Sequence, residues 1–406
     1  MRAEDIDLRH PTPLLGGLSP QAFMRRYWQR RPLLVRGAWP GVQPPLPRPQ
    51  LFALAASECV ESRLVERTGG GPRDWRVRHG PFARRALPPL SRARWTLLVQ
   101  GLDLHVAAAH DMLAPFRFVP AARLDDLMVS WASDGGGVGP HVDAYDVFLL
   151  QVSGRRRWRV APPAPGDAAF VARLPLKILR RFVPVHEWVL EPGDMLYLPP
   201  LWGHDGAAVG GDCMTCSVGF RTPSAGGLAG ELLQRLADAA ATEATRHPRH
   251  YTDAAQAATA RPGAVPAALQ RFAERAVAMA LREPQALARA LGEVLSDPKP
   301  QVWFDAGDRL PPRCGVRLDA RTRLLYDAHH LFINGEALRL EGGAAHGLRR
   351  LADRRELTAG EVSRLAPDAL RCLSQWAEAG WLHAATKAVA RAAPVRSERK
   401  AKERGR

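Results

Sequence analysis

The chain has 406 residues, of which 46% are hydrophobic and 24% are charged, so it can bury more than one core and is neither fibrous nor wholly disordered. Its formal net charge of +16 suggests a nucleic-acid partner. However, only five of the 57 basic residues are lysine, and the chain also holds 35 Gly and 35 Pro. This joint excess is typical of GC-rich coding and weakens the argument from charge.

Several classes of protein are disfavoured by the cysteines and by the apolar runs. The five cysteines are too few and too scattered for a disulfide scaffold. The N-terminus has no apolar signal segment, and no run approaches the roughly 18 apolar residues of a membrane span. We therefore expect a cytoplasmic protein with no part in a membrane.

The predicted secondary structure of the first half of the chain changes near residue 90. Residues 1–90 combine a helical segment, which starts at Ser19-Pro20, with proline-rich connections, and we interpret them as a lead-in that packs on the next domain. Residues 91–224 consist of short β-type runs between glycine or proline turns, such as DVFLLQV and RRRWRV. Short strands without intervening helices predict an antiparallel barrel or sandwich.

Residues 225–296 are rich in alanine and leucine at helical spacing. Their apolar faces exceed what isolated helices need, so they must pack on one another, on the β domain or on a second subunit. We take subunit packing as the explanation, which predicts a homodimer.

A small domain is predicted at residues 297–386. Asn334-Gly335 is a strong hairpin signal, and two helical stretches follow, at 345–355 and 359–379. A hairpin with helices in under ~100 residues indicates an α+β domain of winged-helix type. Residues 387–406 carry eight basic and two acidic side chains, and we interpret them as a disordered tail.

One histidine has a carboxylate two residues further on, at His141 and Asp143. In a strand these side chains share a face and make half a metal site, although such a pair also occurs as a hydrogen-bonded surface pair. The segment EPGDMLYLPPLWGH brings in His204, which we place in a tight loop after a short strand. Two histidines and one carboxylate form the facial triad of non-haem Fe(II) oxygenases.

The run RRRWRV predicts a strand in which Arg156 shares a face with Trp158 and Val160, and this face should point inward. A buried guanidinium requires an anion. The far carboxylate of a dicarboxylic co-substrate meets that need, and a structural Asp or Glu meets it equally well. Alternation also places Tyr145 on the His141 face, where it lines a substrate pocket or belongs to the core.

Together these motifs resemble the JmjC-type cupin oxygenases that use Fe(II), 2-oxoglutarate and O2. The resemblance rests on the His-x-Asp…His spacing, the GGGVGPH lead-in, the DVFLLQVSGRRRWRV hairpin and EPGDMLYLPPLWGH. Within that group the chain is similar to the bacterial ribosomal oxygenases, which hydroxylate an arginine of a large-subunit ribosomal protein. The resemblance implies a mainly β double-stranded β-helix (jelly-roll) core, then a helical dimerisation region and a winged-helix-like domain.

The same resemblance assigns roles to individual residues. It implies that His141, Asp143 and His204 bind the iron and that Arg156 holds the side-chain carboxylate of 2-oxoglutarate. It places the hydroxyl of Ser130 in the 2-oxoglutarate site. On the strand after His204, Ser217 is a further candidate for the substrate pocket.

Three alternatives remain open at this point. In the first, the enzyme hydroxylates a histidine, rather than an arginine, of a ribosomal protein. In the second, the winged-helix region and the tail bind nucleic acid and the cupin is a sensor without catalysis. The third is a metal cupin that acts without 2-oxoglutarate, although such sites usually employ other ligand sets. A contact with ribosomal RNA is compatible with the charge and is left open as well.

Overall fold

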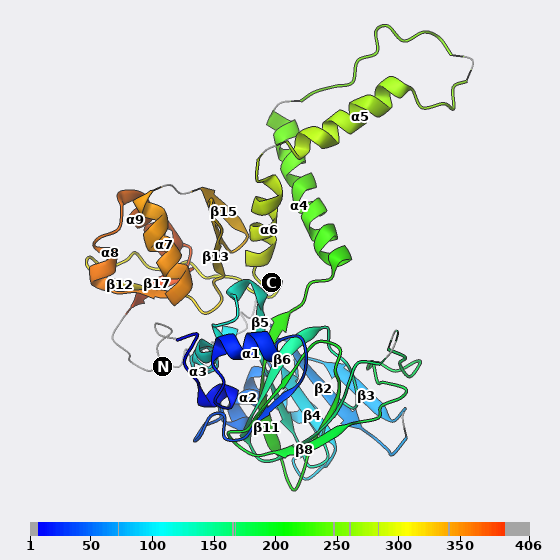
Figure 1. Ribbon diagram of the computed structural model, residues 1–406, viewed down its shortest axis with the longest axis vertical. Coiled ribbons are helices and arrows are strands. Elements are labelled where there is room, and N and C mark those ends of the chain that lie inside the picture. Colours follow the sequence, from blue (N-terminus) through cyan, green and yellow to red (C-terminus); the bar gives the residue numbers. More distant parts are fainter. Residues whose placement is uncertain are drawn as a thin grey trace, which may run out of the picture.

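The computed structural model describes residues 7–385, apart from 72, 165, 167, 247, 260, 283, 340 and 341. The tail predicted at 387–406 lies outside the described residues. Three parts follow one another along the chain: a β-rich core, a group of helices that rises from it, and a small α+β domain (Figure 1).

Two antiparallel sheets form the core. The larger has the strand order β1-β9-β6-β11-β5-β4-β2-β3 and the smaller the order β10-β7-β8. The larger sheet comprises β1 (Leu33–Val35), β2 (Ser62–Arg67), β3 (Trp75–His79), β4 (Trp95–Val99), β5 (Leu124–Ala132), β6 (Tyr145–Ser153), β9 (Met195–Leu198) and β11 (Cys213–Arg221). The smaller comprises β7 (Arg156–Ala161), β8 (His186–Leu190) and β10 (Gly203–Ala208). The prediction of a mainly β double-stranded β-helix core is confirmed.

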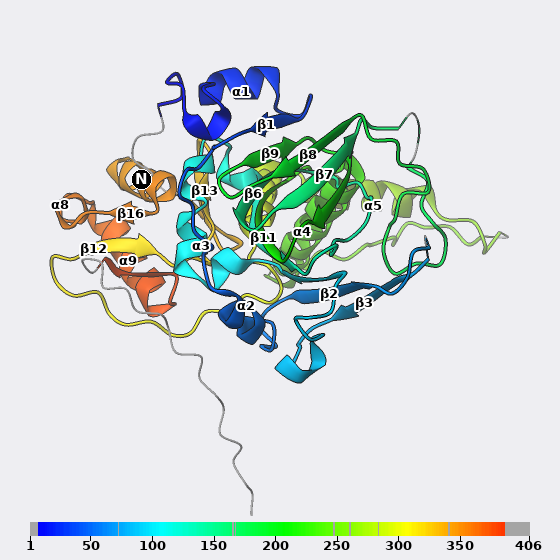
Figure 2. The ribbon, with the colours of Figure 1, turned by 90° about the horizontal axis from the view of Figure 1, so that it is seen from below.

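The space between the two sheets is filled by apolar side chains, because alternate residues of each strand point inward. Strand β7 alternates as the sequence predicts: Arg156 and Trp158 are buried, whereas Arg157 and Arg159 are partly exposed. The buried apolar cluster between the sheets consists of Val147, Leu149, Trp158, Val160, Leu190, Leu196 and Leu198. Figure 2 shows both sheets and the β2–β3 hairpin that extends the larger one.

Residues before position 90 do more than lead into the core, since they supply β1, β2 and β3 of the larger sheet. Their helices are α1 (Pro20–Arg26) and α2 (Arg48–Leu54). Ser19 caps α1 as its Oγ accepts a hydrogen bond from the amide of Ala22, with Pro20 at the first position. Helix α1 ends at Arg26, and the chain then turns at Gln29 (φ 55°) and continues as β1. Phe23 then packs edge-on against Tyr197 of β9.

Short helices complete this half of the molecule. Helix α3 covers Ala107–Asp111, and the 3-10 turns cover Pro13–Leu15, Arg84–Ala86, Leu102–Leu104, Ala114–Phe116 and Ala121–Arg123.

The helical region contains α4 (Ala225–Arg246), α5 (Ala267–Ala280) and α6 (Ala286–Ser296). Helix α6 lies between α4 and the small domain, whereas α5 points away from the rest of the molecule (Figure 1). No residue of α5 is buried within the chain. None of the described helices combines the length and the apolarity that a membrane crossing requires.

The small C-terminal domain has the predicted winged-helix character. Its strands are β12 (Gly315–Leu318), β13 (Leu324–Tyr326), β14 (His330–Ile333), β15 (Glu336–Arg339), β16 (Glu356–Leu357) and β17 (Leu382–Ala385). Its helices are α7 (Gly343–Arg354), α8 (Ala359–Val362) and α9 (Pro367–Glu378).

Two sequence signals of this domain have different outcomes. The hairpin at Asn334-Gly335 is confirmed: both residues have positive φ, 49° and 87°, and they join β14 to β15. A single helix over 359–379 is wrong, because the chain forms α8 and α9 instead. Pro367 has no amide hydrogen with which to continue α8, and it occupies the first turn of a new helix.

Candidate functional site

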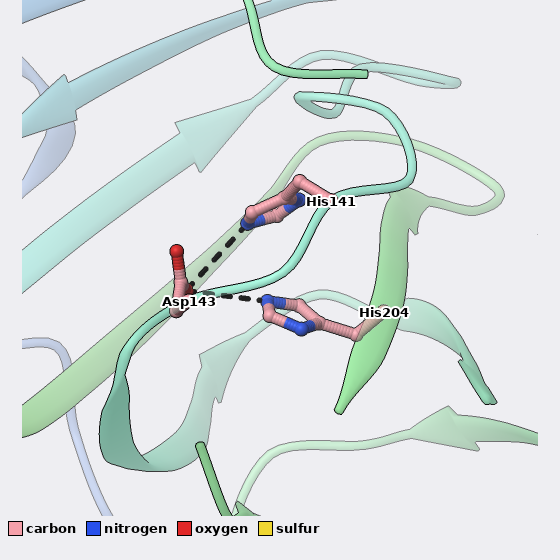
Figure 3. A group of neighbouring side chains, drawn as sticks. All are labelled: His141, Asp143 and His204. Carbon is pink, nitrogen blue, oxygen red and sulfur yellow. Dashed lines mark ion pairs between the residues drawn. The ribbon is translucent and has the colours of Figure 1, made fainter. Parts of the chain in front are cut away.

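The side chains of His141, Asp143 and His204 converge on one point (Figure 3). Their candidate ligand atoms all lie within 4.8 Å of one another. The Oδ2 atom of Asp143 is 3.7 Å from Nε2 of His141 and 3.5 Å from Nε2 of His204. Two imidazole nitrogens and a carboxylate oxygen at this separation can coordinate a single metal ion.

Backbone pairing brings the two histidines together. His204 lies inside strand β10, so its predicted place in a loop is wrong. His141 and Asp143 were expected on a strand but belong to the connection between β5 and β6. His141 forms an isolated antiparallel bridge with His204, whose two N–H···O bonds are 3.0 and 2.9 Å long. The site therefore arises from this bridge between two distant segments of the chain rather than from alternation along one strand.

A carbonyl oxygen orients each imidazole ring. Nδ1 of His141 is 2.9 Å from the carbonyl oxygen of Gly139, and Nδ1 of His204 is 2.9 Å from that of Trp202. A carbonyl only accepts, so we assign the hydrogen of each neutral ring to Nδ1. Metal binding by both rings requires the lone pair of each Nε2 to face the ion, so His204 would release the proton with which it hydrogen-bonds Asp143.

Local electrostatics favours the protonation states that metal ligands need at His141 and Asp143, whereas the hydrogen bond to Asp143 and its charge outweigh burial and raise the pKa of His204. Burial, assisted by the neighbouring His204, lowers the pKa of His141 to about 4. Burial by itself would raise the pKa of Asp143, but the hydrogen bond from His204 and the adjacent imidazoles outweigh it and lower that pKa to about 2. A neutral His141 beside an anionic Asp143 is a donor set that fits a divalent first-row metal ion.

Arg156 is only 4% exposed and lies on β7 facing the same interior. Its Nη1 donates hydrogen bonds to the hydroxyls of Ser130 (2.7 Å) and Thr215 (3.3 Å), while its Nε is buried without a partner. Among the residues that the structure describes, no carboxylate forms an ion pair with Arg156. The alternative of a structural Asp or Glu partner is therefore unsupported, and the unsatisfied guanidinium fits an anionic ligand.

One cavity of about 440 Å³ connects these groups. Every site residue expected from the sequence lines it: Ser130, His141, Asp143, Tyr145, Arg156, His204 and Ser217. Tyr145 is 37% exposed, so it is a wall residue rather than a core tyrosine. Ser130 and Ser217 come from the adjacent strands β5 and β11.

The sequence reasoning missed two acidic residues in the wall of this cavity, Asp125 and Asp126. They lie on β5, within the β-type region that the sequence predicts but for which it indicates no acidic site. Lys299 connects them: its Nζ is 2.7 Å from Asp126 and 3.3 Å from Asp125. Adjacent carboxylates just ahead of Ser130 were the available signal, but their lysine partner lies over 170 positions away and only the fold brings it there.

Comparison with known protein families identifies two domains in this chain. The sequence matches the JmjC domain family over residues 111–228 and the ROXA-like winged helix family over residues 276–383. The chain thus contains a JmjC domain with a His-Asp-His cluster, followed by a ROXA-like winged helix.

Its relatives are ribosomal oxygenases. The chain is 39% identical over 217 residues to the ribosomal protein uL16 3-hydroxylase of Escherichia coli, covering 52% of this chain and 56% of the relative. It is 36% identical over 211 residues to a probable ribosomal oxygenase of Haemophilus influenzae, covering 51% of this chain and 50% of the relative. In these sequence matches, the chain spans about half the length of each relative.

The structural likeness extends further along the chain. The crystal structure of Escherichia coli ycfD superposes with a TM-score of 0.75 at 29% identity, covering 90% of this chain and 97% of that one. A structure of YcfD in complex with cobalt and 2-oxoglutarate superposes with a TM-score of 0.72 at 28% identity, covering 90% and 98%. The similarity therefore includes both the cupin and the winged-helix domain.

Proposed function

We propose that this chain is an Fe(II)- and 2-oxoglutarate-dependent oxygenase that hydroxylates an arginine side chain of a large-subunit ribosomal protein. The observation that carries the proposal is the joint presence, in one cavity, of the His141–Asp143–His204 cluster and the buried Arg156. A metal site alone would suit many cupins. A metal site beside a buried cation without a carboxylate partner suits a metal that works with an anionic co-substrate.

His141, Asp143 and His204 would hold the iron, and Arg156 would hold the far carboxylate of 2-oxoglutarate. The hydroxyl of Ser130 lines this pocket and accepts a 2.7 Å hydrogen bond from Arg156, which would keep the guanidinium in place. The solved YcfD complexes with cobalt and 2-oxoglutarate, and with cobalt and succinic acid, support these roles. When bound, iron and 2-oxoglutarate together supply the activation of O2 that places a hydroxyl on an unreactive carbon.

The protein itself contributes orientation and exclusion of water. Carbonyl oxygens fix both imidazole rings, and the apolar layer of Trp158, Val147 and Leu149 lines the cavity between the sheets. Tyr145 stands at the exposed side of the cavity that holds Asp143, so it can position the substrate beside the ligand set.

The acidic wall favours arginine over histidine as the target. Asp125 and Asp126 line the cavity, and a cationic guanidinium would join the ion-pair network that they form with Lys299. A neutral imidazole gains less from two carboxylates. The relative's name, uL16 3-hydroxylase, supports a large-subunit ribosomal protein as the substrate class.

A homodimer is part of the proposal. Large apolar side chains of the helical region remain exposed within the single chain, including Leu233 (65%) of α4 and Val277 (64%) of α5. Covering them with a second copy would remove that apolar surface from water. Light scattering on the purified chain should give twice the mass of 44.5 kDa. A monomer at micromolar concentration would contradict this part of the proposal.

The central experiment loads the full chain with Fe(II) and 2-oxoglutarate without oxygen, adds ribosomal proteins and then admits O2. Mass spectrometry should find one added oxygen on an arginine of one large-subunit protein, with succinate formed in equal amount. An added oxygen on a histidine would instead select the histidyl alternative. No modified ribosomal protein, together with tight DNA binding, would select the regulator.

Two matched variants make the result specific to the site. His141→Ala should abolish the modification because it removes a metal ligand. His329→Ala removes an exposed histidine of the winged-helix domain and should leave it intact. Equal loss in both variants would show that the modification does not depend on this site.

A further inference from the structure

A second cavity of about 770 Å³ lies beside the active-site cavity, on the outer side of the small sheet. We call it the arginine groove, after the four arginines that line it: Arg67, Arg94, Arg157 and Arg159. Arg67 comes from the β2–β3 hairpin, Arg94 directly precedes β4, and the other two lie on β7. Side chains from three separate segments of the chain are therefore gathered along one groove.

The groove has more positive than negative charge. Of its arginines, only Arg159 forms an ion pair with another described residue, at 2.5 Å from Asp205. Arg67, Arg94 and Arg157 have no carboxylate partner within the described part of the chain. The remaining acidic residue in the wall, Asp134, accepts a hydrogen bond from the amide of Gly211 and is not paired with a cation. Four arginines against two aspartates give the lining a net charge of +2, which favours an anionic partner.

The guanidinium of Arg67 is held in position before any partner arrives, and the backbone that carries Arg94 is fixed as well. The guanidinium of Arg67 lies over the ring of Trp75 at 5.5 Å and donates to the carbonyl of Gly70. Arg94 adopts a left-handed backbone conformation (φ 63°), and its amide donates to the carbonyl of Asp134. Preorganised guanidiniums lose little entropy on binding and match the geometry of phosphate oxygens.

The groove and the active site share a wall. Ile178 lines both cavities, and the segment 137–140 that leads to His141 separates them. Adjacent residues of β7 point to opposite sides: Arg156 into the active site and Arg157 into the groove. A polyanion in the groove would therefore run within a few residues of the substrate segment bound at the metal.

We propose that the arginine groove binds the phosphate backbone of single-stranded RNA beside the protein segment that enters the active site. This inference rests on the proposed function, because a ribosomal protein is an RNA-binding substrate. The chain and its basic substrate repel each other, and an RNA that contacts both offsets this repulsion. An acidic protein segment is the competing occupant, and the experiment below separates the two.

The test measures binding of a fluorescein-labelled twelve-nucleotide RNA to the full chain by polarisation at several salt concentrations. The variant R67Q/R94Q/R157Q should weaken binding about tenfold near physiological salt and reduce the slope of log affinity against log salt by about 2, because three phosphate contacts are lost. The matched control R9Q/R25Q/R26Q removes the same charge from exposed arginines around α1 and should change neither quantity.

Three results would overturn the inference. They are equal weakening in both triple variants, no weakening in either, and displacement of the RNA by poly-glutamate at the same charge concentration. If the groove variant unfolds, Arg157→Gln alone should still reduce the salt slope by about 0.7. The measurement needs neither iron nor 2-oxoglutarate, so absence of hydroxylation would refute the proposed function and leave the RNA result standing.

Discussion

Arginines withdrawn from water occur in two regions of this molecule, and their hydrogen-bond acceptors differ. In the active-site cavity, Arg156 donates to two hydroxyls and keeps a buried Nε without a partner. Where the cupin meets the winged-helix domain, Arg117 donates to the carbonyls of Ala352 and Asp353, and Arg323 donates to that of Asp125. Arg117 and Arg323 thus link one domain to the other through backbone carbonyls.

The comparison shows that burial of an arginine does not by itself identify a ligand site. Burial, reinforced by Arg221, lowers the pKa of Arg323 to about 10, so the interface also carries an electrostatic cost. Carbonyl acceptors offset that cost within the protein. Arg156 has weaker acceptors and an unused donor, and it faces a cavity rather than another domain. What identifies a binding role is the combination of an unsatisfied donor and an adjacent space.

The largest effect is expected at the metal ligands. Asp143→Ala removes the only carboxylate of the three-residue cluster. We expect the rate of hydroxylation to fall by at least about 10³-fold, as is typical when an enzyme loses a whole catalytic group. Product formation by mass spectrometry measures this. Asp308→Ala, which removes an exposed aspartate, is the control, and residual activity within tenfold of wild type in Asp143→Ala would contradict the site.

Replacement of Arg156 distinguishes the two kinds of arginine directly. Arg156→Gln should raise the KM for 2-oxoglutarate about 100-fold, because a buried charge-assisted contact is lost, with little change in the iron requirement. Arg155→Gln is the matched control, since the neighbouring side chain is exposed. A parallel rise in both requirements would indicate a structural role like that of Arg117.

The interface arginines should show the opposite behaviour. Arg117→Gln removes donors to two backbone carbonyls of the winged-helix domain and should lower the free energy of unfolding by about 2 kcal/mol. The KM for 2-oxoglutarate should stay as in wild type. Denaturant unfolding and steady-state kinetics measure the two quantities, with exposed Arg364→Gln as the control. A shift in KM without loss of stability would remove the distinction between the regions.

The smallest predicted effect depends on pH. His110 lies at the same interface, where burial and the charges of Arg355 and Arg117 lower its pKa to about 3. The unfolded chain, with a histidine pKa near 6.5, therefore takes up a proton that the folded chain excludes. Stability should fall as the pH decreases from about 6.5 toward 3.

His110→Phe should remove this contribution. The difference in unfolding free energy between pH 7 and pH 5 should shrink by about 1 kcal/mol relative to wild type, since the side chain is partly exposed. Denaturant titrations at the two pH values measure it. An identical pH dependence in both proteins would show that His110 is not the titrating group.

Local signals in the sequence were sufficient for several elements of the fold and for naming the residues that line the cavity. Alternation in RRRWRV correctly predicted that Arg156 and Trp158 are buried, and Asn334-Gly335 correctly predicted a tight hairpin. These predictions succeeded because strand alternation and positive φ are properties of neighbouring residues. The single helix over 359–379 failed because the break at Pro367 was overlooked, although the proline itself was visible.

The sequence by itself determined which side chains are available for chemistry, namely the His141, Asp143 and His204 set and one inward-facing arginine. Tertiary structure decided how they meet: the His141–His204 bridge aligns the rings, and Lys299 reaches Asp126 from another part of the chain. It also decided that Arg67, Arg94 and Arg157 share one groove. Contacts between distant segments depend on sheet order and domain packing, and no local pattern of residues encodes those.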